Sequence, residues 1–192
     1  ETCLDYRFDL GSLGCADSCQ SAATDKCQSF SWVPIDAPIT WQITDIWAHS
    51  TTDIYVVGFK GETIDEAFTC AYRFECGFIG HYDGFTWQEI ELDYEVPPIA
   101  GIWGTPNGEL HAVGFVGHTV HYDGSKWNIS IGDFDVHLLR VWGLDERHIY
   151  AVGIRQIGLF NERDIVPAIM YFDGERWQPA ALQETDYPEK IN

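Results

Sequence analysis

The chain has 192 residues, of which 45% are hydrophobic and 15% are aromatic, and this composition suffices for one packed domain with a sizeable core. Thirty acidic residues oppose eleven basic ones, so the formal net charge of −19 repels phosphate backbones and anionic lipid surfaces. We therefore expect no nucleic-acid partner. Because no apolar run is long enough to span a bilayer, we also expect no direct membrane insertion.

Residues 1–38 are expected to form a cysteine-rich arm, because four cysteines crowd a segment that shows little hydrophobic periodicity. These are Cys3, Cys15, Cys19 and Cys27. The chain has six cysteines and no Cys-x-x-Cys pair, which favours disulfides over a zinc site and indicates a secreted or cell-surface protein. We predict that Cys70 pairs with Cys76 to close a hairpin, and the pairing within the arm stays open.

Residues 39–192 are expected to form a β-repeat domain, because one pattern occurs three times in this part of the chain. Each copy begins with an aliphatic residue and a Trp, continues into a short β-forming run that ends at Gly, and closes on aromatic-Asp-Gly-x-x-Trp. The first Trp of each copy is Trp47, Trp103 or Trp142. Asp-Gly between β-forming runs is a strong hairpin signal, because Gly tolerates the positive φ of a tight I′ turn.

Each copy is therefore predicted to be a small antiparallel sheet of three or four strands. Such a sheet cannot bury its apolar face alone and must pack against the next copy. The sequence thus predicts an all-β, propeller-like repeat with units at about 41–87, 97–127 and 136–177. A further strand around residues 40–43 would add a partial unit to these three blades.

Histidines that share a column with an aromatic residue of another copy are interpreted as structural. His111 occupies the column of Tyr55 and Tyr150, and His121 occupies the column of His81 and Tyr171. His49 and His118 share no such column.

His49 follows Trp47 by two residues, so an extended backbone would place the indole and the imidazole on the same side. His118 lies in the shortest connection among the three copies and could supply a second imidazole. Imidazole suits copper, zinc, iron and nickel. The alternative is that His49 and His118 are unrelated surface histidines.

The Trp47-x-His49 motif and a later His in an acidic, aromatic-rich β protein with extracellular character resemble the surface-associated copper-binding proteins of methanotrophic bacteria, the MopE and CorA type. The resemblance implies one Cu(I) held by two histidines and a kynurenine derived from the Trp. It assigns the kynurenine to Trp47 and the imidazoles to His49 and His118, with His121 as the alternative to His118. It also implies copper acquisition at the outer cell surface, with a cell-surface or copper-uptake partner.

The alternative function is a secreted module that recognises carbohydrate or protein and has no metal role. We do not expect an enzyme, because the chain has no Gly-x-Ser-x-Gly, His-Glu-x-x-His or phosphate-loop motif.

Overall fold

The computed structural model describes residues 10–11, 14–15, 22–23, 27–28, 41–61, 70, 75–158 and 164–180. The chain divides into two compact units, Glu1–Ala37 and Pro38–Asn192. In the first unit β1 (Leu10–Gly11) pairs with β4 (Cys27–Gln28), and β2 (Gly14–Cys15) pairs with β3 (Ala22–Ala23), both antiparallel. The cysteine side chains of this arm lie outside the described residues.

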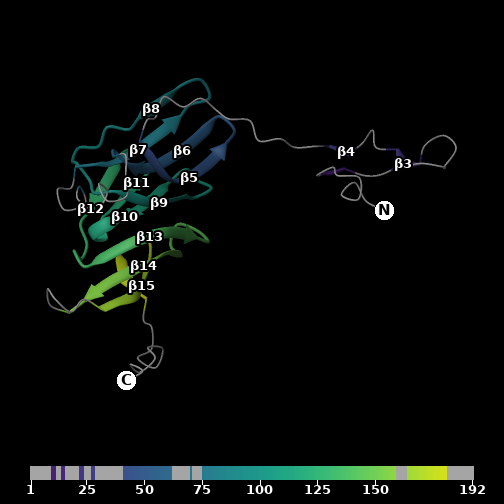
Figure 1. The fold of residues 1–192 in the computed structure, drawn as a ribbon. Coiled ribbons are helices and arrows are strands. Elements are labelled where there is room, and N and C mark those ends of the chain that lie inside the picture. The colour runs from purple at the N-terminus through teal and green to yellow at the C-terminus, as the bar shows by residue number, and fades with distance from the viewer. Residues whose placement is uncertain are drawn as a thin grey trace. The chain divides into compact units, whose positions relative to one another are not determined.

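The described part of the second unit consists of three four-stranded antiparallel sheets, which follow one another in chain order (Figure 1). The first sheet contains β5 (Gln42–Ser50), β6 (Asp53–Phe59), β7 (Gly77–Tyr82) and β8 (Trp87–Glu89). The second contains β9 (Ile99–Gly104), β10 (Leu110–Gly114), β11 (Thr119–Tyr122) and β12 (Trp127–Ser130). The third contains β13 (Val136–Gly143), β14 (Ile149–Ile157), β15 (Asp164–Phe172) and β16 (Trp177–Pro179).

The predicted all-β, propeller-like repeat is confirmed, since each copy of the pattern forms one sheet. The strand predicted around residues 40–43 is the beginning of β5, so it belongs to the first sheet and forms no separate partial unit.

The Asp-Gly turns close hairpins as predicted, but with four-residue loops in place of a two-residue I′ turn. Tyr82 pairs with Trp87 across the first of these loops, and Gly84 has a φ of 93°. Asp83 Oδ1 accepts the Thr86 backbone N–H at 2.8 Å, and the backbone hydrogen bonds lower the pKa of the Asp83 carboxyl. The same arrangement recurs at Asp123 and Asp173. Asp therefore fixes each loop from within, while Gly supplies the left-handed backbone.

Apolar side chains fill the spaces between consecutive sheets. One core cluster joins the first and second sheets through residues such as Val57, Ile79 and Ile102. Another joins the second and third sheets through residues such as Val113 and Val141. Burial of these facing surfaces is what holds successive sheets together.

In the first and second sheets, a Trp lies across a glycine of the next sheet. A Cβ on Gly104 would lie 2.5 Å from Trp47 Cζ2, and a Cβ on Gly143 would lie 2.7 Å from Trp103 Cη2. Real Cβ atoms essentially never approach other atoms this closely, so a larger residue at either position would force the indole or the strand to shift. Gly104 directly follows Trp103, so the Trp103-Gly104 dipeptide contributes to both interfaces of the second sheet.

The predicted disulfide between Cys70 and Cys76 is confirmed, with the two Cα atoms 5.8 Å apart. It lies in the connection between β6 and β7, where the buried Cys76 packs with Phe59. In the described part of the chain no helix has the length and apolar character needed to cross a membrane.

Candidate metal site

Each sheet carries a row of side chains across its four strands, next to the Asp-Gly turn. We call these the ring rows. They are Trp47, Tyr55, His81 and Gln88 in the first sheet, Trp103, His111, His121 and Asn128 in the second, and Trp142, Tyr150, Tyr171 and Gln178 in the third. Because the strand register is the same in all three sheets, equivalent residues of the repeat occupy equivalent positions in space.

The ring row of the second sheet brings two histidines and a carboxylate together. The imidazoles of His111 and His121 stack with 4.3 Å between centroids and 16° between ring planes. His121 Nε2 lies 3.2 Å from Glu109 Oε2. One potential ligand atom from each of the three residues lies within 4.8 Å of the other two. A group of this kind could hold a metal ion if the side chains closed by several tenths of an ångström, since metal–ligand bonds are about 2.0–2.2 Å long.

His111 is the most unusual member of this cluster, because its side chain is buried and its Nε2 atom has no hydrogen-bond partner. Burial, together with the nearby His121, lowers the pKa of His111 to about 3. The imidazole is therefore neutral at physiological pH, which is the form that binds metals. A buried polar atom without a partner costs about 1–3 kcal/mol, and a coordinate bond would remove that cost.

The cluster borders a cleft between the second and third sheets with a volume of about 550 Å³. His121 lines this cleft together with Thr119, Met170 and Trp177. The side chains of His121 and Glu109 are partly exposed, unlike that of His111. An ion can therefore reach the cluster from solvent through its more exposed members.

The first sheet repeats this arrangement with one ring changed. His81 Nε2 lies 2.7 Å from Asp53 Oδ1, and Tyr55 stacks on His81 as His111 stacks on His121. Tyr55 takes the place of His111, and burial and the Asp53 carboxylate raise its pKa to about 12. An acid–histidine pair is thus part of the repeat, and a second imidazole beside it is a feature of the second sheet.

The third sheet has tyrosine at both ring positions. The Tyr171 hydroxyl donates a hydrogen bond to the Arg147 carbonyl at 3.0 Å. His148 contacts Asp145 with 2.7 Å between Nδ1 and Oδ1.

Two of the residues predicted from the Trp-x-His motif lie together. The rings of Trp47 and His49 have centroids 5.8 Å apart, and both side chains belong to β5. Trp47 faces the second sheet, where it covers Gly104, and His49 is exposed.

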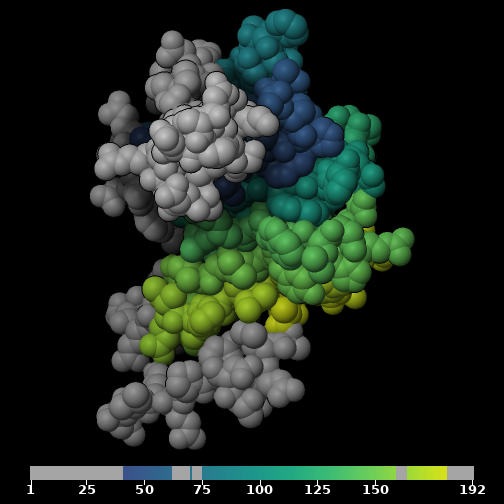
Figure 2. Space-filling view, turned by 90° about the vertical axis from the view of Figure 1, so that its right-hand side faces the viewer, coloured from purple at the N-terminus to yellow at the C-terminus, as the bar shows by residue number. Residues whose placement is uncertain are grey.

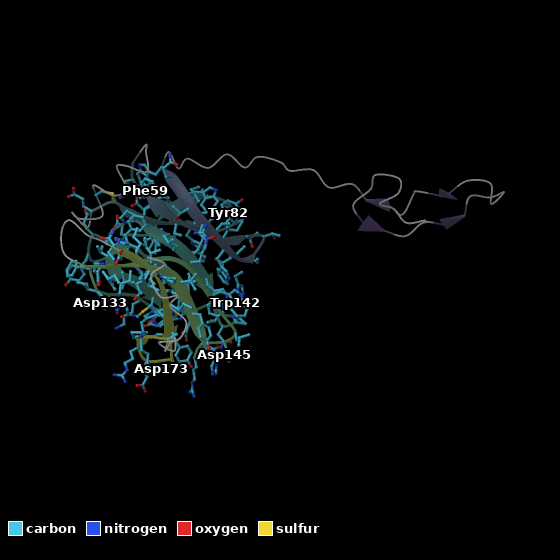
Figure 3. The ribbon with its side chains drawn as sticks, turned by 60° about the horizontal axis from the view of Figure 1, so that its bottom comes forward. Phe59, Tyr82, Asp133, Trp142, Asp145 and Asp173 are labelled. Atoms are coloured by element: carbon cyan, nitrogen blue, oxygen red, sulfur yellow. A yellow bond between two sulfur atoms is a disulfide. The ribbon has the colours of Figure 1, made fainter. Side chains whose placement is uncertain are left out.

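The structure does not bring His118 to this pair. The His118 carbonyl accepts a hydrogen bond from the Gly114 N–H, at the last residue of β10. Leu110, at the other end of β10, pairs with Gly104. Trp47 covers Gly104, so roughly 13 Å of strand separates the two levels. Gly117 directly precedes His118, and a Cβ on Gly117 would lie 2.7 Å from the Asp133 nitrogen. In Figure 3, Asp133 lies on the side opposite to Tyr82 and Trp142.

His118 is instead buried, and its Nδ1 lies 3.1 Å from the Val116 carbonyl. The alternative ligand, His121, also does not join Trp47. It lies near Phe172 of the third sheet, whereas Trp47 packs against the opposite face of the second sheet. The predicted set of Trp47, His49 and His118 is therefore not gathered around one point, because the strand register separates its members.

Glu109 and His111 were not identified from the sequence as ligands, because column sharing marked His111 as structural. A usable signal was present, since only the second copy has histidine at both ring positions together with an acidic residue two positions before the first. The repeat columns predict where these residues lie, and they carry no information about ligand binding.

No family model and no curated protein match the chain. Among solved structures, the fold is similar to that of a chain described as "YCF48 bound to D1 peptide", with a TM-score of 0.52 and 18% sequence identity. The match covers 78% of this chain and 45% of that chain, so the present chain spans less than half the length of this structural neighbour. The likeness supports a propeller-like fold.

Proposed function

We propose that the protein binds one copper ion at Glu109, His111 and His121. The buried, unpartnered Nε2 of His111, stacked beside a second imidazole that already contacts a carboxylate, carries this proposal. His111 and His121 supply nitrogen ligands and Glu109 supplies an oxygen ligand. Protons compete weakly for His111 because its pKa is so low.

The ligand set favours a divalent ion. Two imidazoles with a carboxylate suit Cu(II) and Zn(II), whereas Cu(I) prefers softer ligands and the resemblance to the methanotroph proteins implied Cu(I). Cu(II) stands highest in the Irving–Williams order, so it is the ion proposed for this site.

The proposed biological role is copper acquisition outside the cell. Disulfide usage supports an oxidising compartment, and the net charge of −19 raises the local concentration of cations around the protein. Such a role requires binding and release of the ion, without chemistry on a substrate. A copper-uptake protein at the cell surface is the proposed recipient.

The test is the metal content of the purified protein after Cu(II) loading and removal of free ion. Wild type is expected to retain one copper per chain, whereas His111→Tyr and His121→Tyr lose it. Tyrosine is the natural residue at the same positions of the third sheet, so both variants should fold, as circular dichroism would verify. Zn(II) competition measures metal selectivity.

His49→Ala is the matched control, since it removes the exposed histidine beside Trp47. It is expected to leave copper binding unchanged. Full copper in the two tyrosine variants would refute the site, and loss of copper in His49→Ala would favour the Trp-x-His motif.

Oxidation of Trp47 to kynurenine stays a prediction with its own measurement. The Trp47 peptide from natively produced protein would gain one oxygen and lose one carbon. An unchanged mass would remove the kynurenine while leaving the cluster around His111 unaffected.

Recognition of a protein or carbohydrate is the second candidate function. It is favoured by an apolar cleft of about 390 Å³ that is lined by the exposed side chains Tyr94, Ile131 and Phe134. Binding to a glycan array or peptide library that persists in the presence of a chelator and is lost in Tyr94→Ala would support this function.

A further inference from the structure

The outer face of the third sheet is uncovered where the equivalent faces of the other two sheets are buried. Val57, Val113 and Val152 occupy the same column, and their exposed fractions are 0%, 1% and 45%. Val57 is covered by the second sheet and Val113 by the third. Among the described residues, no fourth sheet covers Val152.

Several large apolar side chains share this uncovered face. Trp142 is 58% exposed, and Tyr150, Val152 and Ile165 are exposed on the same side of the sheet. In Figure 3, Trp142 lies at the margin of the second unit. In Figure 2, residues of the third sheet, coloured green to yellow, form a broad part of the visible surface. The third sheet therefore presents an apolar face of the same kind as the faces with which the first and second sheets contact their following sheets.

The first sheet carries the complementary uncovered face. Ile46, Ile102 and Val141 occupy one column and face the preceding sheet, with exposed fractions of 61%, 4% and 7%. Ala48 is the equivalent, in the first copy of the repeat, of Gly104 and Gly143, and it is exposed. Gly104 and Gly143, in contrast, each lie under the indole of the preceding sheet. The described part of the second unit thus has one face lacking a following sheet and one face lacking a preceding sheet.

We propose that these two faces bind each other between two copies of the chain. Trp142 of one copy then covers Ala48 of the other, continuing the column in which Trp47 covers Gly104 and Trp103 covers Gly143. A contact between different faces closes into a ring when its rotation allows. Propellers have 4–8 blades, so two copies with three sheets each fall within that range.

Ala48 makes the proposed contact distinguishable from general hydrophobic adhesion. Its methyl group lies where the two internal interfaces have only hydrogen, so the Trp142 ring must sit farther out than Trp47 or Trp103. Ala48→Gly should therefore tighten association, although it removes apolar surface. The net charge of −19 opposes association, and added salt should strengthen it by screening.

The test measures the mass of the full chain in solution by light scattering over a range of concentration and salt. Wild type is expected to form a dimer at high salt, and Ala48→Gly is expected to dimerise at lower concentration. Trp142→Glu should raise the dissociation constant about thirty-fold or more, as expected for a buried interface Trp. Ile165→Glu probes the same face without touching the Trp column.

Mixing two variants separates this contact from other modes of association. Trp142→Glu keeps an intact first-sheet face, and Ile46→Glu keeps an intact third-sheet face. Each alone should be monomeric, while an equimolar mixture should regain a dimer through the one remaining intact pair of faces. Phe85→Glu, at an exposed turn residue outside both faces, is the control and should behave as wild type.

A monomer at all concentrations and salt levels would overturn the proposal, as would a dimer that Trp142→Glu and Ile46→Glu leave intact. Longer assemblies that depend on Trp142 would support the contact and reject closure at two copies.

Discussion

The Tyr55 ring stacks on the His81 imidazole with 4.3 Å between centroids and 17° between ring planes, as His111 stacks on His121 in the next sheet. Because Asp53 already contacts His81, replacing one ring should complete a second ligand set. We predict that Tyr55→His binds a second copper ion, raising the copper content from one to two per chain after loading.

Tyr150→His is the matched control for this substitution. It introduces a histidine at the same column of the third sheet, where the stacked partner is Tyr171 and His148 stands in the column of the carboxylates Asp53 and Glu109. Its copper content should stay at one per chain. A second copper in Tyr150→His, or none gained in Tyr55→His, would contradict the ligand set proposed for the second sheet.

Gly104→Ala tests the packing of Trp47 across the next sheet. The new methyl carbon would lie 2.5 Å from the indole, so the ring or the strand must move. We predict a loss of about 1–3 kcal/mol in the free energy of unfolding, measured by urea denaturation. Trp47→Phe should partly relieve the clash, so the double variant should be less unstable than the sum of the single changes. Strict additivity would argue against direct contact.

The stability of the metal-free protein should fall as the pH drops below about 6.5. Burial lowers the pKa values of His111, His118 and His137 in the folded protein. Below about pH 6.5 these histidines are therefore protonated in the unfolded chain but stay neutral in the folded one, which favours unfolding. Each histidine that stays neutral in the fold contributes a slope of about 1.4 kcal/mol per pH unit below its unfolded pKa.

Urea denaturation between pH 4.5 and 6.5, with chelator present, measures this slope. Because the pKa of folded His111 is about 3, His111→Tyr should remove this histidine's contribution to the pH slope of the free energy of unfolding across the whole window. An unchanged slope in His111→Tyr would mean that this imidazole is protonated in the fold.

The disulfide between Cys70 and Cys76 closes a short loop next to the first sheet. Replacing both cysteines with serine should lower the free energy of unfolding by about 2 kcal/mol, mainly because the unfolded chain gains freedom. Copper binding at the second sheet should be unaffected.

The sheets could be predicted from the sequence because each copy of the repeat contains the residues that determine its turns and its packing against the next sheet. Asp83 and Gly84 specify a turn locally, and the Trp47 column specifies packing against a neighbour. The predicted two-residue I′ turn is wrong, because Asp-Gly alone does not show that the loop includes two further residues.

The candidate site was harder to predict because it depends on cross-strand register. His111 and His121 are ten positions apart in the chain but directly opposite each other on β10 and β11. His118, only three positions before His121, lies at the far end of the same hairpin. Nearness in sequence and absence from a repeat column could not reveal either relationship.

The acid–histidine pair that recurs in the first and second sheets also bears on how such proteins diverge. Two of the three sheets carry the carboxylate and histidine that make up part of the proposed ligand set, so under that proposal a single tyrosine-to-histidine change in the neighbouring ring column converts a structural stack into a binding site. Metal affinity can thereby arise, move along the array or disappear through point substitutions, with no new loop and no change of architecture.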